Sequence, residues 1–179
     1  MQSYQRVACQ SRHENVGYNP LVVRRLDKEI ADRAGIDAVI EAAEVCRLAF
    51  ARGDEPYVVP VSFGYDGEAL YFHSAPRGRK LEFIAANPRI CFELEADVAL
   101  HVNADDPCAW TFAYRSVIGY GTVIELTSVG DKSAGLNRIM QHYSGSEWPI
   151  GAAAVATTRV WRIDIESLTG KRSPAELTP

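Results

Sequence analysis

The chain has 179 residues, which is enough for one domain with a sizeable core and too few for two full domains. Its hydrophobic content of 47% and charged content of 23% are ordinary for a globular protein. The net charge of −4 argues against a nucleic-acid binder that relies on overall electrostatics, and it makes any local cluster of cations conspicuous.

The ends of the chain differ from its middle. Residues 1–22 are polar and lack periodicity, so we expect an N-terminal arm, a domain over residues 23–172 and a polar C-terminal tail over 173–179. The first residues contain no apolar run of the kind that a secretory signal needs, and no segment approaches the length of a transmembrane span. We therefore expect no membrane partner.

Periodicity predicts the elements between these ends. In chain order they are a helix near 36–43, strands at 46–52, 57–65 and 68–75, a helix over 78–88, long strands at 89–102 and 109–127, a helix over 128–145, a glycine- and alanine-rich connection and a last strand at 158–168. Pro60 cannot donate to a ladder, so its strand should have a free edge or a bulge there. Gly119 and Gly121 indicate bending within their strand.

Hairpin-linked strands with glycine bends favour a mainly β fold, an antiparallel β-barrel with peripheral helices, over a parallel doubly wound sheet. The cysteines are Cys9, Cys46, Cys91 and Cys108, and none forms a Cys-x-x-Cys pair. This spacing favours buried free thiols over disulfides or a zinc site, and hence a reducing, cytoplasmic compartment.

Three motifs in the sequence do not meet the requirements of known sites. The glycines at 119 and 121 lack the third glycine of a dinucleotide fingerprint and lie within a strand. The segment 170–173 resembles the end of a phosphate loop, but that motif would need glycine where Ile165 stands. A third group matches no standard metal spacing, so we expect no metal there: His101, Asp105, Asp106 and Cys108.

The stretch "LYFHSAPRGRKLEF", residues 70–83, places two cations, Arg79 and Lys80, at the start of a helix. A helix N-terminus attracts phosphate and disfavours cations unless an anion compensates. The stretch alone supports two interpretations equally. One is an anion site, and the other is an exposed basic turn paired with Glu82 or Glu68. Similarly, Arg115 in its apolar strand either pairs with a carboxylate, which its residue type favours, or reaches a ligand.

Taken together, the segments "VCRLAF", "PYVVPVSFGYDGEALYFHSAPRGRKLEFIAANPRICFELE" and "YRSVIGYGTV" resemble the pyridoxamine 5'-phosphate oxidase-like, flavin-binding split β-barrel family. Within it, the chain most resembles the nitroimidazole-resistance (Nim) branch. The match extends from Arg24 to Lys171. The resemblance implies an antiparallel, Greek-key split β-barrel that binds FMN, and a homodimer with flavin sites at the subunit interface.

The resemblance also implies roles for individual residues. The strand 59–63 would lie along the isoalloxazine ring, and the strand end at 72–74 would lie beside that ring. The helix start at 78–80 would bind the FMN phosphate, and the strand residues 115–117 would contact the phosphate from a second side. The implied cofactor contacts are Val59, Pro60, Val61, Ser62, Phe63, Phe72, His73, Ser74, Gly78, Arg79, Lys80, Arg115, Ser116 and Val117. The strand with Trp110 and Tyr114, or the helix with His142 and Tyr143, would line the partner's site.

His73 matches a histidine that the Nim branch places near the flavin, and it is the catalytic candidate. An imidazole there could donate to the reduced cofactor or to a substrate oxygen, or it could be a polar packing residue without proton transfer. The final segment "IESLTGKRS" lacks the Arg-Leu-His substrate element of the founding oxidase. We therefore expect no pyridoxamine phosphate oxidation.

Three functions remain for a protein of this kind. The first is an FMN-dependent reductase of nitroaromatic or other small electrophiles, with a small-molecule substrate and an electron donor bound without a nicotinamide fingerprint. The second is a flavin-binding module without dedicated catalysis, favoured by the lack of a general acid besides His73. The third keeps the barrel but binds haem or a deazaflavin.

Overall fold

The predicted strands form in a computed structural model that describes residues 23–174. In chain order the strands are β1 (Glu29–Ile30), β2 (Cys46–Arg52), β3 (Glu55–Val61), β4 (Phe63–Tyr65), β5 (Ala69–Ser74), β6 (Arg89–His101), β7 (Thr111–Leu126) and β8 (Arg159–Ser173). The α-helices are α1 (Arg33–Ala42), α2 (Arg79–Ala86), α3 (Val129–Ser144) and α4 (Ala152–Thr157). Short 3-10 turns occupy Leu26–Lys28 and Pro107–Ala109.

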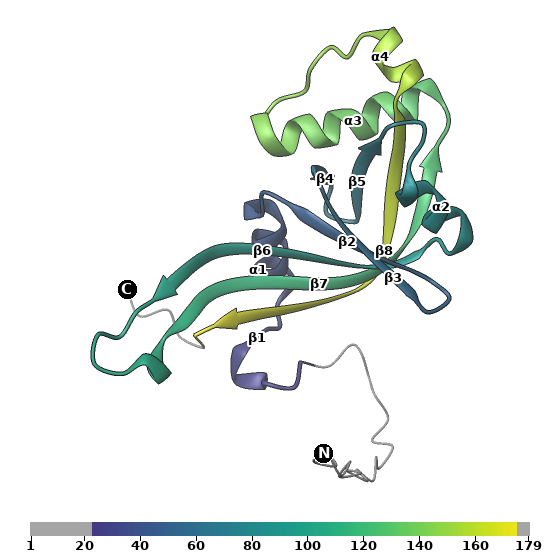
Figure 1. Ribbon diagram of the computed structural model, residues 1–179. Coiled ribbons are helices and arrows are strands. Elements are labelled where there is room, and N and C mark those ends of the chain that lie inside the picture. Colours follow the sequence, from purple (N-terminus) through teal and green to yellow (C-terminus); the bar gives the residue numbers. More distant parts are fainter. Residues whose placement is uncertain (1–22, 175–179) are drawn as a thin grey trace, which may run out of the picture.

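All pairings in the sheet are antiparallel. The order is β3-β2-β6-β7-β8-β5-β4, with β1 added beside β8. Within residues 23–174 the path is open, because β3 and β4 end it without pairing to each other. Long, bent β6, β7 and β8 extend through the molecule, and the helices lie around them (Figure 1). The predicted mainly β, antiparallel fold with peripheral helices is confirmed.

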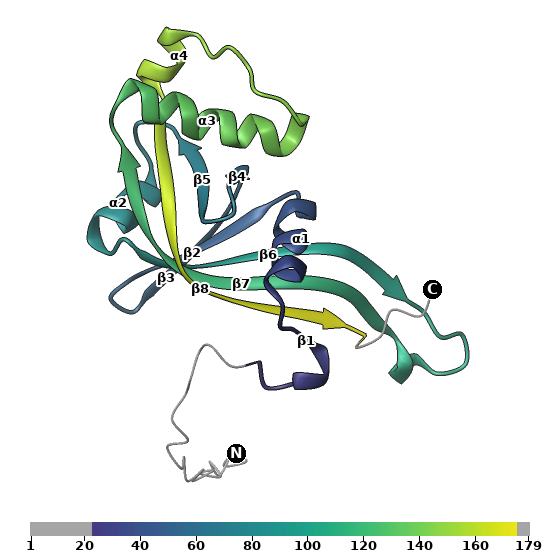
Figure 2. The same cartoon turned by 180° about the vertical axis from the view of Figure 1, so that it is seen from behind.

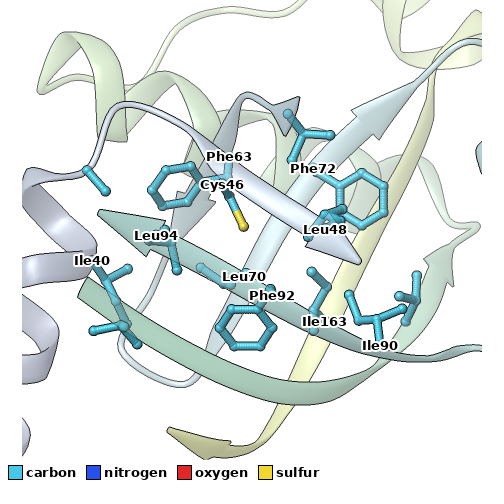
Figure 3. Packing of buried hydrophobic residues seen from close by; sticks show 14 of the residues in the cluster. Ile40, Cys46, Leu48, Phe63, Leu70, Phe72, Ile90, Phe92, Leu94 and Ile163 are labelled. Carbon is cyan, nitrogen blue, oxygen red and sulfur yellow. The ribbon is translucent and has the colours of Figure 1, made fainter. Parts of the chain in front are cut away.

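The core lies against this sheet, where large apolar side chains from β2, β4, β5, β6 and β8 meet (Figure 3). Leu48, Phe72, Phe92 and Leu94 are at most 1% exposed. Each such burial contributes roughly 1.5–3 kcal/mol relative to an exposed side chain. The spacing of these residues at every second position is the alternation that predicted the strands.

The single strand predicted over 57–65 is wrong. The chain leaves β3 after Val61 and restarts as β4 at Phe63, so that β3 pairs with β2 and β4 pairs with β5. The N–H of Phe63 is donated to the hydroxyl of Tyr143 (3.2 Å) on α3. The free edge predicted at Pro60 is confirmed, because β3 is an edge strand of the sheet.

Two further elements differ from expectation at the end of the chain. The connection before the last strand contains α4, and β8 continues past Leu168 to Ser173. The last strand, which the sequence predicts to end at Leu168, is therefore five residues longer than expected. The added part of β8 is polar and contains Gly170, where an added Cβ would lie 2.8 Å from Cβ of Ile30. β1 and α1 pack closely against this glycine, and β1 and β7 both pair with the extended part of β8.

The predicted bend of β7 lies where its register with β8 shifts, between Tyr120 and Gly121. At Gly119 an added Cβ would overlap the ring of Phe92, so that glycine lets β7 approach the core. The helix predicted from Ser128 is confirmed, because the Ser128 hydroxyl accepts the N–H of Asp131 (3.0 Å) as an N-cap.

Seen from behind, α3 and α4 lie at one end of the molecule, and the paired ends of β6 and β7 project at another (Figure 2). We call residues 97–112 the β6–β7 arm. The arm and α2 lie on opposite sides in both views. The start of α2 and the exposed β6–β7 arm are therefore well separated in the molecule.

Candidate functional site

A pocket of about 380 Å³ opens where β5 ends and α2 begins. It is lined by Tyr57, His73, Ser74, Ala75, Arg77, Gly78, Arg79, Lys80 and Leu81. The structure therefore brings together the strand end and the helix start that the sequence singled out. Its lining includes three cations and no carboxylate, in a protein that is acidic overall.

The first turn of α2 presents backbone donors to this pocket. Gly78 precedes the helix with φ of 145°, a conformation that favours glycine, and no side chain caps the helix start. The leading N–H groups of a helix have no intrahelical partners and carry a partial positive charge. This end of α2 can therefore hydrogen-bond an anion.

Lys80 has no carboxylate within ion-pairing distance among the described residues. Its ammonium group lies over the ring of Phe72, 5.3 Å from the centroid. The partial burial of the ammonium lowers the pKa of Lys80 below its ordinary value. A half-buried cation with this environment carries an uncompensated desolvation cost, which a bound anion would offset.

Arg79 is engaged differently. Its guanidinium pairs with the carboxylate of Glu55 and lies over the Tyr57 ring, 5.1 Å from the centroid. Glu55 also pairs with Arg52 (2.8 Å), and hydrogen bonds from Arg52 and then from Arg79 lower the pKa of that carboxyl. The alternative partners considered from the sequence, Glu82 and Glu68, are not the ones that Arg79 contacts.

His73 lies on the outward face of β5 and borders the same pocket. The pKa of His73 is lowered from its ordinary value of 6.5, first because burial disfavours the charged ring and second because the Lys80 charge repels the added proton. At neutral pH the imidazole is therefore neutral, with one nitrogen able to donate and one able to accept.

We expect this shift to make stability depend on pH. A histidine whose pKa is depressed by folding stabilises the fold fully above its unfolded pKa of about 6.5 and loses that contribution as the pH falls through the folded pKa. In an NMR titration of the cofactor-free protein, the His73 imidazole should titrate below 6.5, and Lys80→Met should raise its pKa. A pKa at or above the ordinary value would contradict the geometry of this pocket.

The segment expected along a flavin ring lies beside the pocket but does not form its lining. Pro60 and Ser62 are exposed, Val59 is half-buried, and Val61 and Phe63 point into the core. Because Phe63 donates its N–H to Tyr143, that group is not available to a ring edge. The exposed backbone around Ser62 remains the part of this segment that a ligand can reach.

Helix α3 holds that segment in place. The Tyr143 hydroxyl accepts the N–H of Phe63 and donates to the carbonyl of Glu44 (2.8 Å), and the His142 ring lies 4.2 Å from the Phe63 ring. These two residues, which the resemblance offered as contacts to a partner's site, support the β3–β4 junction of their own chain.

The other expected phosphate contacts do not line the α2 pocket. Arg115 pairs with Asp97 at the base of the β6–β7 arm, Ser116 lies opposite Glu95 in the β6–β7 register, and Val117 is fully buried. The carboxylate-paired interpretation of Arg115 therefore holds within this chain. Sequence reasoning missed Tyr57 and, behind the pocket, Trp161. The signal for Trp161 would have been its register with Phe72, which no local pattern reveals.

Within residues 23–174, no group of histidine, cysteine and acidic side chains is placed to hold a metal ion. Cys46, Cys91 and Cys108 are free thiols. Only Cys46 is buried, whereas Cys91 is half-buried and Cys108 is exposed, so the expected burial holds for one of them. Cys9 and the N-terminal arm lie outside the described residues.

Among the helices of the described chain, none combines the length and apolar character that crossing a membrane requires.

An open antiparallel barrel sheet with a cation-lined pocket at a helix start defines the chain as a split β-barrel protein. The sequence model described as pyridoxamine 5'-phosphate oxidase matches residues 32–172. The chain therefore belongs to the pyridoxamine 5'-phosphate oxidase family, as the sequence resemblance implied.

Solved structures agree with this membership. A candidate 5-nitroimidazole antibiotic resistance protein from Bacteroides thetaiotaomicron is 29% identical, with a TM-score of 0.71 over 80% of this chain and 86% of that chain. An FAD-binding protein from Mesorhizobium loti is 27% identical, with a TM-score of 0.57 over 79% of this chain and 95% of that one. The flavocytochrome Anf3 from Azotobacter vinelandii, at 21% identity and a TM-score of 0.73 over 88% and 73% of the two chains, shows the shared fold.

One curated relative, an uncharacterised protein from Rhizobium meliloti, is 32% identical over 65 residues. That match spans 36% of this chain and 42% of the relative's length.

Proposed function

We propose that this protein is an FMN-binding oxidoreductase whose cofactor phosphate is held at the start of α2. The observation that carries the proposal is the half-buried Lys80, which has no acidic partner within the described chain and lies beside an uncapped helix N-terminus. A phosphomonoester would offset that charge and accept hydrogen bonds from the leading N–H groups of α2. The FAD-binding relative at 27% identity supports a flavin, and a cradle of this kind suits the terminal phosphate of FMN.

Each group in and beside the pocket has an assigned role. Lys80 and the α2 N-terminus bind the phosphate. Arg79, which stays paired with Glu55, adds positive charge near the phosphate. His73 and the exposed backbone near Ser62 border the ring. Flavin supplies the electron-transfer chemistry, and the protein supplies binding, orientation and protons.

The proposed reaction is the reduction of nitroaromatic or other small electrophiles by NAD(P)H. The likeness to the candidate nitroimidazole resistance protein supports this substrate class. Reducing a nitro group to a nitroso group with NAD(P)H consumes a proton from solvent and releases water. His73, exposed at the pocket, can relay that proton to the substrate oxygen. Pyridoxamine phosphate oxidation is not proposed, because β8 carries no Arg-Leu-His element.

Steady-state turnover tests the reductase. FMN-loaded protein should oxidise NAD(P)H in the presence of a nitroimidazole, and His73→Gln should lower kcat while leaving the FMN affinity within about twofold. Tight flavin binding with no turnover of any tested acceptor would contradict the reductase. It would favour a flavin-binding module, an alternative supported by the lack of a carboxylic acid in the pocket lining.

We further propose a homodimer that uses the β6–β7 arm. Apolar side chains on the arm are 49–59% exposed: Val98, Leu100, Val102, Trp110 and Phe112. Leu100 and Phe112 are register partners and so share one face. A two-stranded ribbon with an apolar face is marginal in water and typical of an interface. Trp110, Tyr114, Arg115 and Ser116 would then contribute across the subunit interface.

Placing a charge on the arm tests the dimer. The variant Leu100→Asp should convert the dimer to a monomer in sedimentation at micromolar concentration, because an aspartate would be buried without a partner. Val58→Asp, at an exposed apolar position on β3 away from the arm, serves as the matched control. A variant at Leu100 that sediments like the unaltered protein would contradict the assignment of the arm to the interface.

The free thiols of Cys46, Cys91 and Cys108 support a reducing, cytoplasmic location for the protein, which we include in the proposal.

A further inference from the structure

A second pocket, of about 320 Å³, lies between α3 and the part of the sheet where β5 and β8 are neighbours (Figure 1). We call it the α3 pocket. It shares no lining residue with the pocket at α2, and its size falls in the range of small-molecule sites, roughly 300–1,000 Å³. Its lining includes Tyr71, Leu126, Asp131, Gly135, Arg138 and Arg162.

Side chains from a helix and from a strand pair meet at the α3 pocket. Asp131, Gly135 and Arg138 are three or four positions apart on α3, so they lie on one face of the helix. Tyr71 and Arg162 are partners in the antiparallel β5–β8 register, so their side chains lie next to each other. One guanidinium group from the helix and one from the sheet therefore border the same space.

Gly135 lets α3 pack closely over this part of the sheet. An added Cβ there would lie 3.0 Å from a methyl carbon of Leu126 and 3.2 Å from a ring carbon of Tyr71. A larger residue would displace α3 or fill part of the space. The α3 pocket therefore combines an apolar wall, formed by Leu126 and the Tyr71 ring, with two cations.

The two guanidinium groups have few partners of their own. Arg138 makes no ion pair or hydrogen bond within residues 23–174. Arg162 pairs with Asp164 through Nε (2.6 Å), but neither of those two atoms makes a hydrogen bond, and the terminal amino groups of Arg162 have no recorded partner in the described chain. Two like charges at one pocket repel each other, and a bound anion would offset that repulsion.

The Tyr71 hydroxyl lies close enough to both arginines to sense their charges. Burial, and then the hydrogen bond that the hydroxyl donates to Asp66 (2.8 Å), raise the pKa of Tyr71 to about 12. The charges of Arg162 and Arg138 act against that rise. Both cations therefore lie near one hydroxyl group.

The carboxylates on this side of α3 are engaged with other groups. Asp66 accepts hydrogen bonds from Tyr71 and from two backbone N–H groups of its own hairpin. Asp131 accepts the hydroxyl proton of Ser128 (2.6 Å) in the first turn of α3. Neither carboxylate forms an ion pair with Arg138, so the terminal N–H groups of the two arginines remain available to a ligand.

We propose that the α3 pocket binds a small organic anion. The carboxylate or phosphate of this anion lies between the guanidinium groups of Arg138 and Arg162, which match such groups in geometry and charge. The apolar part of the anion packs against the Tyr71 ring and Leu126. The site is separate from the FMN site proposed above and does not depend on it.

Titration of ¹⁵N-labelled protein with phenyl phosphate and with benzoate, followed by NMR, tests the proposal. It is made with and without FMN, because the α2 pocket also attracts anions. The amide signals of Leu126 and Gly135 should shift in both cases, with Kd values that agree within about twofold, whereas the amide of Gly78 should shift only without FMN. The probe that binds more tightly shows whether the α3 pocket prefers phosphate or carboxylate.

Substitution of either arginine should weaken binding of both probes at the α3 pocket. Arg138→Gln and Arg162→Gln should each raise the Kd about five- to tenfold, because a charge-assisted hydrogen bond is lost. Lys132→Gln, also on α3 but outside the lining, is the matched control and should change the Kd less than about twofold. Arg138 is exposed and unpaired within the described chain, so Arg138→Gln should fold normally and carries the test if Arg162→Gln does not fold.

An unchanged Kd in Arg138→Gln would overturn the inference. Binding of benzyl alcohol, a neutral analogue, as tightly as phenyl phosphate would do so as well, because the cations would then contribute nothing. Shifts at Gly78 without shifts at Leu126 and Gly135 would contradict the α3 pocket and leave the proposed FMN site standing.

Discussion

Replacing Lys80 with alanine is expected to weaken FMN binding by about ten- to a hundredfold and to leave riboflavin binding nearly unchanged. The ammonium is half-buried, lies over Phe72 and has no acidic partner within the described chain, so a bound anion would be its ion-pairing partner. A hydrogen bond to a charged group contributes about 1.5–3 kcal/mol, which corresponds to that range of affinities. Fluorescence titration of both flavins measures the effect.

The same substitution should not destabilise the cofactor-free protein. Because burial lowers the pKa of Lys80, the charged form opposes folding below that pKa, and an alanine or methionine there removes the opposition. Lys132→Ala on α3, where the ammonium donates to the Ala156 carbonyl (3.4 Å), is the matched control and should change neither affinity. A Lys80→Ala protein that binds FMN as tightly as the unaltered protein, or one that unfolds much more easily, would contradict the assignment.

Replacing Gly64 with alanine is expected to destabilise the fold strongly. A Cβ at this position would lie 2.5 Å from both the carbonyl oxygen of Arg138 and the backbone nitrogen of Ile139. These atoms belong to the backbone of α3, which cannot rotate away as a side chain can. We expect a loss of about 2–3 kcal/mol, or roughly 4–12 °C in Tm for a domain of this size.

Gly151→Ala is the matched control for this prediction. Nothing lies within 4 Å of a Cβ at Gly151, and its φ of −62° suits alanine. Its Tm should stay within about 1–2 °C of that of the unaltered protein. Because α3 also carries Tyr143, displacement of α3 by Gly64→Ala should loosen the Phe63 hydrogen bond as well. Unfolding curves that are equal for the two variants would show that α3 does not pack on β4 as described.

Much of the fold follows from local patterns. The alternation in β2, β5, β6 and β7 and the Ser128 cap of α3 appear at or near their predicted positions, because each depends on neighbouring residues alone. Local patterns did not predict the interruption between β3 and β4 at Ser62. It depends on α3, which packs against Gly64 from 74 positions further along the chain. Likewise, β8 extends past Leu168 because β1 and β7 pair with it, which its polar sequence does not reveal.

The candidate site was predictable where its residues are contiguous in sequence. The segment from His73 to Lys80 forms one pocket because a strand, a short loop and a helix follow each other directly. Contacts made across the sheet were not predictable. The Arg79–Glu55 pair, the Tyr57 ring beneath that guanidinium and the Trp161–Ser74 hydrogen bond all join segments whose register only the folded sheet defines. The ion pair of Arg115 is a contact across the sheet whose kind was predictable. An arginine in an apolar strand favours a carboxylate partner, and Arg115 pairs with Asp97.

The visible absorption spectrum of the protein, purified and then titrated with FMN, tests the central claim most directly. We predict a yellow protein with flavin absorption bands that takes up one FMN per chain and releases it when Lys80 is replaced by alanine. A haem Soret band without flavin bands, or FMN uptake that is indifferent to Lys80, would contradict the account.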